Sequence, residues 1–98
     1  MIIHVPKEHK IMTVMNVGDG HNFMRYAILE DGTSSCCIYT TLEDRKIGIF
    51  ANGEYPIPED VNLDFPDLLI HADSVEGLDV FIAMLTNMRD DMKEAANG

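Results

Sequence analysis

The last third of the chain repeats apolar residues at the spacing of an amphipathic helix, and this pattern constrains the fold more than any other feature. At about 100° per residue, seven large apolar side chains fall within an arc of roughly 160°. Asp73 fits an N-cap, and Glu76 three residues later completes a capping box. We therefore expect one long C-terminal helix from about Asp73 to Glu94. Its core-facing residues should be Leu78, Phe81, Ile82, Met84, Leu85, Met88 and Met92.

The same helix gathers its acidic residues on the opposite side, within an arc of about 120°. Arg89 and Lys93 lie along one border between the two sides. One side should therefore cover a sheet, while the other presents a ridge of carboxylates to water or to a partner. The acidic side consists of Asp73, Glu76, Asp79, Asp90, Asp91 and Glu94.

Short runs of β-type residues separated by turn sequences fill the first half of the chain. Asp31-Gly32 and Asn52-Gly53 are typical of tight hairpin turns, and the glycines between Gly18 and His21 can take positive φ. Pro6 should end the first run, because proline cannot donate to a strand ladder. This pattern predicts three consecutive hairpins. The expected runs are 2–5, 11–17, 23–30, 34–42, 46–51 and 54–57, with one more short strand at 68–71.

The fold class that follows is α+β: an antiparallel β-meander of about five strands with one C-terminal amphipathic helix packed on one face. A chain of 98 residues fits a single domain over 1–98. In the runs from Phe23 to Leu29 and from Cys36 to Tyr39, apolar residues occur at positions that face both sides of the sheet. One helix can cover only one of these two faces. The second face should be covered either by the Pro-rich loop over 54–67 or by a second copy in a homodimer.

The charge is strongly acidic and unevenly distributed. The formal net charge is −10, and no Lys or Arg occurs between Lys46 and Arg89. Phosphate backbones are bound by Lys and Arg, so this composition argues against direct nucleic-acid binding and favours a basic protein surface as partner. The acids within the base-free stretch are Glu54, Glu59, Asp60, Asp64, Asp67, Asp73, Glu76 and Asp79.

The sequence predicts a cytoplasmic protein, in its own cell or in an infected host. No run approaches the roughly 18 apolar residues of a membrane span, and the N-terminus lacks the apolar stretch of a signal peptide. Cys36 and Cys37 are adjacent within a predicted strand, so their side chains should point to opposite faces and share neither a disulfide nor a metal.

Motifs for metals, cofactors and catalysis are missing, and none of these is expected. His4, His9, His21 and His71 have no C-x-x-C or H-x-x-x-H spacing for zinc. Asp60, Asn62 and Asp64 match the first ligands of a calcium loop, but Phe65 replaces the required glycine and His71 the closing glutamate. Phosphate-binding loops and nucleophile elbows are also lacking.

In size and charge the chain is similar to two groups of small acidic proteins: phage or plasmid inhibitors of host defence nucleases, and immunity proteins that neutralise basic toxins. This similarity implies a non-enzymatic counter-defence or immunity protein whose carboxylates occupy a basic surface of a partner, such as a nucleic-acid-binding surface, as a nucleic-acid mimic would. The predicted partner contacts are Glu59, Asp60, Asp64, Asp67, Glu76, Asp79, Asp90 and Asp91.

Two other hypotheses stay open. The first is an accessory or structural homo-oligomeric subunit that acts through an apolar sheet face or through Met84, Met88 and Met92, with the charge serving solubility. The second is a small hydrolase or ligand-binding enzyme, which requires a concave pocket joining at least two of His21, His71 and Cys36.

Overall fold

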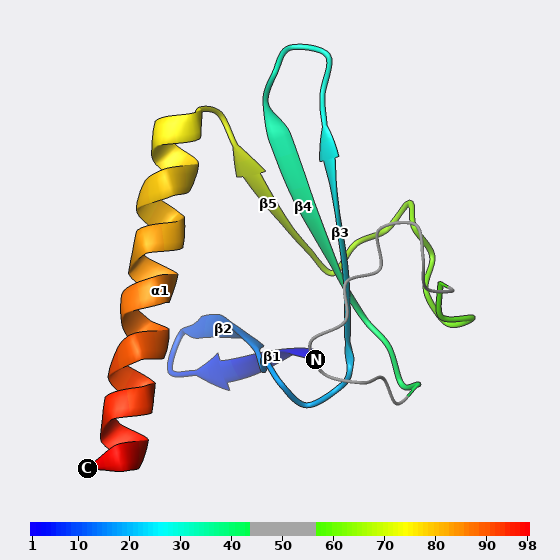
Figure 1. The fold of residues 1–98 in the computed structure, drawn as a ribbon. Coiled ribbons are helices and arrows are strands. Elements are labelled where there is room, and N and C mark those ends of the chain that lie inside the picture. Colours follow the sequence, from blue (N-terminus) through cyan, green and yellow to red (C-terminus); the bar gives the residue numbers. More distant parts are fainter. Residues whose placement is uncertain (44–56) are drawn as a thin grey trace.

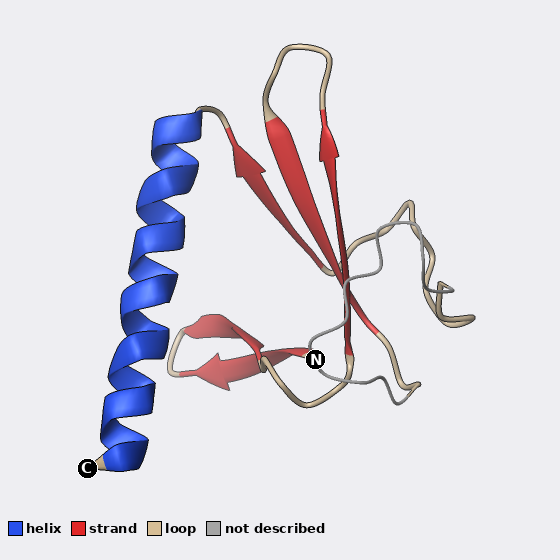
Figure 2. Cartoon of the chain, in the orientation of Figure 1, coloured by secondary structure: helices blue, strands red, loops and turns tan. Residues whose placement is uncertain are grey.

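The computed structural model describes residues 1–43 and 57–98 and contains five strands and one helix in these ranges (Figures 1 and 2). This arrangement of antiparallel strands and a C-terminal helix confirms the α+β class. The predicted hairpin around Asn52-Gly53 lies outside the described residues, apart from Ile57. The elements are β1 (Ile2–Lys7), β2 (Lys10–Met15), β3 (Asn22–Ile28), β4 (Ser34–Thr40), β5 (Leu68–Ala72) and α1 (Val75–Asn97).

The strands form two antiparallel sheets, with β1 paired to β2 and with β3, β4 and β5 side by side in that order. The chain crosses between the sheets at Gly18 and Gly20, whose φ angles are 101° and 82°. The expected hairpin between the second and third runs is therefore wrong, because β2 takes β1 as its partner instead. Pro6 does not end β1 either; it lies opposite Ile11 in a two-stranded ladder, where every strand is an edge that tolerates proline.

The turn between β3 and β4 forms where Asp31-Gly32 predicted it. Gly32 has a φ of 87°, and Leu29 N–H donates to the Thr33 carbonyl at 2.8 Å. The Asp31 carboxylate accepts hydrogen bonds from Thr33 N–H at 2.9 Å and from the Thr33 hydroxyl at 2.6 Å. These bonds lower the pKa of Asp31, the hydroxyl contributing most. They fix the register in which Ile28 faces Ser34.

The core lies at one end of the three-stranded sheet. Phe23 is 2% exposed, and its ring centroid lies 5.8 Å from that of buried Tyr39. The Tyr39 hydroxyl donates to the Leu63 carbonyl at 2.7 Å, so the loop over 57–67 lies against the Tyr39 end of this face. Leu69, farther along the same face, is 50% exposed. On the opposite face, Ile2 N–H donates to the Thr40 hydroxyl at 3.0 Å and attaches β1.

The other end of the sheet is open on the face opposite Phe23 and Tyr39. The pairing register places Tyr26 and Ile28 of β3 on this face. Tyr26 is 61% exposed and Ile28 is 67% exposed. The sheet therefore retains an apolar surface that the described residues do not cover.

Helix α1 packs against the sheet at its N-terminal end and then diverges from β5 (Figure 1). Ser74, not Asp73, is the N-cap: its hydroxyl accepts from Gly77 N–H at 3.1 Å. Asp73 instead bonds back to His71, so the neighbouring serine is left to satisfy the helix N–H group. None of the 23 residues of α1 is buried.

Candidate partner-binding surfaces

The four helix acids predicted to contact a partner are all exposed on α1. Glu76 lies in the first turn, where a carboxylate is favoured by the helix dipole. Asp90 pairs with its neighbour Arg89, with the guanidinium Nη2 3.0 Å from the carboxylate. This contact is exposed on both sides and contributes little to stability. With Asp79 and Asp91, these acids form what we call the helix acidic group: Glu76, Asp79, Asp90 and Asp91.

The loop acids predicted for the same surface divide into two kinds. Asp60 accepts hydrogen bonds from the Thr41 hydroxyl and from Leu42 N–H, both at 2.7 Å. These bonds lower the pKa of Asp60, the backbone bond from Leu42 most. Asp67 accepts from Thr40 N–H, also at 2.7 Å. Both carboxylates thus fasten the loop to the end of β4.

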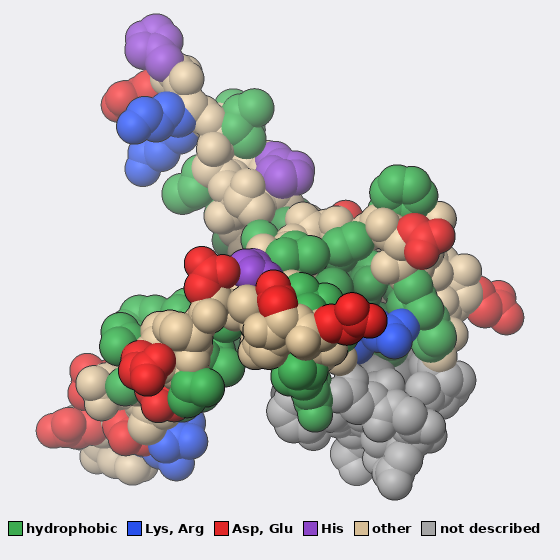
Figure 3. Space-filling view, turned by 90° about the horizontal axis from the view of Figure 1, so that it is seen from above, with side chains coloured by type: hydrophobic (Ala, Val, Ile, Leu, Met, Phe, Trp, Pro, Cys, Tyr) green, Lys and Arg blue, Asp and Glu red, His purple; other side chains and the backbone are tan. Residues whose placement is uncertain are grey.

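The remaining loop acids, Glu59 and Asp64, are exposed. The loop that carries them and α1 lie on opposite sides of the three-stranded sheet (Figure 1). A second view shows acidic side chains on separate parts of the molecule, with apolar side chains between them (Figure 3). Among the described residues, the loop and helix acids therefore do not form one continuous acidic surface.

The residues of the hydrolase hypothesis do not converge. His21 lies beyond the start of β3, where its Nδ1 is 3.1 Å from the Thr41 carbonyl, whereas His71 lies beside Ser35 at the opposite end of β4. Strand geometry separates these ends of β4 by about 20 Å. Cys36 and Ser35 point to opposite faces. Burial raises the pKa of the Cys36 thiol, which disfavours a nucleophilic thiolate.

His71 does sit between a hydroxyl and a carboxylate, a contact that sequence spacing could not reveal. Its Nδ1 is 3.0 Å from Ser35 Oγ, and its Nε2 is 3.0 Å from Asp73 Oδ1. A nucleophile, base and orienting acid have this order in hydrolases. Asp73 is 89% exposed, however, so water screens its contact with the imidazole. The arrangement ties β4, β5 and the start of α1 together at the surface.

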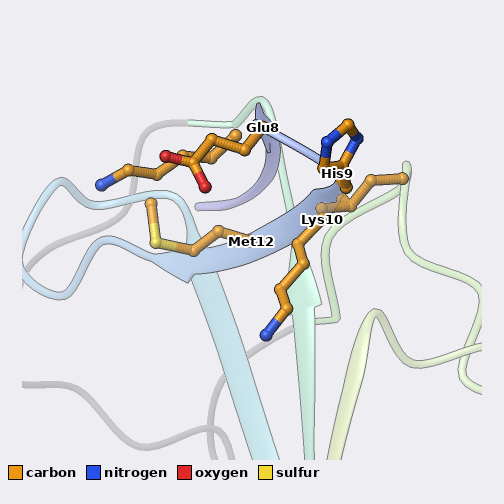
Figure 4. Close-up of a pocket in the computed structure, with 6 residues that line it drawn as sticks. Glu8, His9, Lys10 and Met12 are labelled. Atoms are coloured by element: carbon orange, nitrogen blue, oxygen red, sulfur yellow. The ribbon is translucent and has the colours of Figure 1, made fainter.

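A hollow at the tip of the β1–β2 hairpin is lined by two lysines, a histidine, a glutamate and two apolar residues. Glu8 has a φ of 56°, which turns the chain between Lys7 and Lys10. The side chains of Glu8, His9 and Lys10 point in different directions (Figure 4). Their charged ends do not converge on one point, so the hollow offers no evident ligand site. Its lining is Lys7, Glu8, His9, Lys10, Ile11 and Met12.

A groove lies where β5 meets the start of α1. Ile70 and Ala72 contribute from the strand, and Leu78 and Phe81 contribute from the helix. Beyond this groove the apolar side of α1 continues without cover, because Met88 and Met92 are 53% and 66% exposed. The sequence predicted that this side would face the sheet, but only its first turns do so.

Within residues 1–43 and 57–98, no three His, Cys, Asp or Glu side chains are grouped closely enough to hold a metal ion. The helix described here is not apolar enough to cross a bilayer. No protein-family model, curated protein or solved structure matches the chain.

Proposed function

We propose that this protein is a non-enzymatic binding protein, of the inhibitor or immunity kind, that engages a basic surface of a partner protein through the acidic side of α1. The observation that supports this most is the exposure of the whole helix acidic group on one side of a single helix. Arg89 pairs with Asp90, whereas no Lys or Arg between residues 57 and 88 offsets Glu76 and Asp79.

The mechanism follows from long-range electrostatics. A net charge of −10 attracts a basic partner before contact, and the carboxylates then pair with Lys or Arg across the interface. Such attraction acts over a Debye length of about 8 Å at physiological salt and weakens as salt is added. Association should therefore be fast at low salt and slow at high salt.

The proposal assigns different roles to the predicted contact residues. Asp60 and Asp67 are engaged in holding the loop, so the helix acidic group takes the main role. Glu59 and Asp64 lie on the other side of the sheet (Figure 1) and would meet a different part of any partner. The two groups can therefore be tested separately.

Capture of partners from lysate at low and high salt, followed by mass spectrometry, tests this proposal. Tagged wild type should retain a basic protein at low salt and release it at high salt. The Glu76→Lys, Asp90→Lys variant should lose that protein, whereas the matched loop variant Glu59→Lys, Asp64→Lys should keep it. Capture that is equal in all three proteins, or insensitive to salt, would contradict the proposal.

A second candidate function is an accessory subunit that works through apolar contacts, with charge serving solubility. The exposed apolar surfaces at Tyr26, Ile28 and the far end of α1 favour it. A partner bound in this way should remain bound at high salt. The same capture experiment therefore separates the two candidates.

A further inference from the structure

Six residues of α1 follow one another at alternating spacings of three and four. This is the a/d pattern of a helix that pairs with another helix, and it is narrower than the stripe needed to cover a sheet. Its residues extend from the second turn almost to the end of α1. We call them the seam: Leu78, Phe81, Leu85, Met88, Met92 and Ala95.

The seam is progressively uncovered along the helix. Leu78 and Phe81 are each 36% exposed beside β5, Leu85 is 40% exposed, and Met92 is 66% exposed. A helix of 23 residues is about 34 Å long, whereas the five residues of β5 span only about 17 Å. The sheet edge is too short to cover the seam, so most of it lacks an apolar neighbour within the described chain.

We propose that the seam is covered by α1 of a second copy of this chain, running antiparallel to the first. The resulting homodimer would bury the apolar side of both helices. The C-terminal end of each helix would enter the groove that Ile70, Leu78 and Phe81 line in the other copy. This inference does not rest on the proposed function, because the seam and the helix acidic group lie on different sides of α1.

The exposed area supports a second copy as the occupant. A folded monomer of 11.0 kDa typically exposes about 5,600 Å². The whole chain exposes 7886 Å², and α1 contributes to this large area because none of its 23 residues is buried. A standard interface needs about 800 Å² from each partner, and obligate homodimers use more. The radius of gyration is 15.3 Å, whereas about 12.6 Å is typical of a compact domain of this length, so the chain is more extended than usual.

The side chains of the seam fit an antiparallel register. If Leu85 lies opposite Met88 of the second copy, then Phe81 meets Met92 and Leu78 meets Ala95. Each layer pairs a larger side chain with a smaller or more flexible one, which favours close packing. The small Ala95 would let the helices approach where Leu78 already contacts the sheet.

The helix dipoles favour the same direction. Antiparallel pairing places the positive N-terminal end of each helix beside the negative C-terminal end of the other. Parallel pairing would place like ends together.

Sedimentation velocity and light scattering test the association itself. Wild type should have a mass of twice 11.0 kDa, and the Leu85→Asp, Met88→Asp variant should have the mass of one chain. The matched control Val80→Asp lies on the opposite side of α1 and should remain dimeric. A monomeric wild type at the highest concentration reached, or a dimer that persists in the double variant, would overturn the proposal.

Disulfide trapping tests the direction in a background with Cys36→Ser and Cys37→Ser. Leu78→Cys and Ala95→Cys proteins should cross-link with each other when mixed, and neither should cross-link with itself. Self-cross-linking of Ala95→Cys alone, with no mixed product, would overturn the antiparallel register.

Discussion

The Asp60 carboxylate accepts two hydrogen bonds at the end of β4 and so joins the loop over 57–67 to the sheet. These bonds favour its ionised form and hold the pKa of Asp60 below its usual value of 3.8. A carboxyl group whose pKa is lower in the folded state than in the unfolded state stabilises the fold at pH values above its unfolded-state pKa. That stabilisation is lost as the pH falls through the folded pKa.

Replacing Asp60 by Asn should therefore destabilise the protein at pH 7 and matter less under acid conditions. Urea unfolding of wild type and variant measures the loss of unfolding free energy at pH 7 and at a series of pH values below 3.8, the usual pKa of an Asp carboxyl. Asp64→Asn is the matched control, since the Asp64 side chain makes no hydrogen bond among the described residues and should change stability little. Equal effects of the two variants at pH 7 would contradict the assigned role.

Glu8 adopts a positive φ of 56° in the two-residue turn between β1 and β2. A side chain with a Cβ is strained there, while glycine is not. Glu8→Gly should therefore raise the free energy of unfolding, by up to about 1 kcal/mol after the larger entropy of unfolded glycine is subtracted. Glu8→Ala removes the same charge but keeps the Cβ, so it should not stabilise. Urea unfolding of both variants separates backbone strain from charge.

At the scale of the element, α1 begins at a single hydrogen bond. The Ser74 hydroxyl accepts from Gly77 N–H, whereas Asp73 is turned toward His71. Since no residue of α1 is buried, tertiary packing supports this helix less than usual and the cap matters more.

Ser74→Ala should cost about 1 kcal/mol of stability, because it removes the acceptor for an otherwise unpaired helix N–H. Asp73→Ala should cost less, because its contact with His71 is exposed. Chemical unfolding followed by circular dichroism near 222 nm, a wavelength characteristic of helix, compares the two. A larger loss for Asp73→Ala would mean that Asp73 is the effective cap.

At the scale of the whole molecule, the sheet, the β1–β2 hairpin and α1 extend in different directions around a small core (Figure 1). The strongly buried side chains include Phe23, Ile38 and Tyr39, all at one end of the three-stranded sheet. The open apolar surfaces at Tyr26 and along the seam remain outside this core. Burial of these surfaces between copies would supply the hydrophobic stabilisation that one chain lacks.

If two copies share their helices, the unfolding temperature should depend on protein concentration. Wild type should melt at a higher temperature as concentration rises, because mass action favours the dimer. The Leu85→Asp, Met88→Asp variant should melt lower and at a temperature independent of concentration. Differential scanning calorimetry over a concentration series measures both. A concentration-independent wild type would be inconsistent with a dimeric native state.

Local patterns determined much of this fold. Asp31-Gly32 placed the β3–β4 turn, and the periodicity of the C-terminal residues placed α1, because both signals arise from backbone geometry within a few residues. The cap shifted by one residue, because Ser74 and Asp73 are both good caps and only the contact with His71 distinguishes them.

The tertiary structure alone decided how these elements meet. Sequence spacing could not reveal that β2 leaves the three-stranded sheet, that Ser35 reaches His71, or that the loop acids lie across the sheet from α1. Each depends on contacts between residues far apart in the chain, which local periodicity does not encode. The sequence by itself determined an amphipathic acidic helix, and the tertiary structure decided that its apolar side stays exposed, because β5 is too short to cover it.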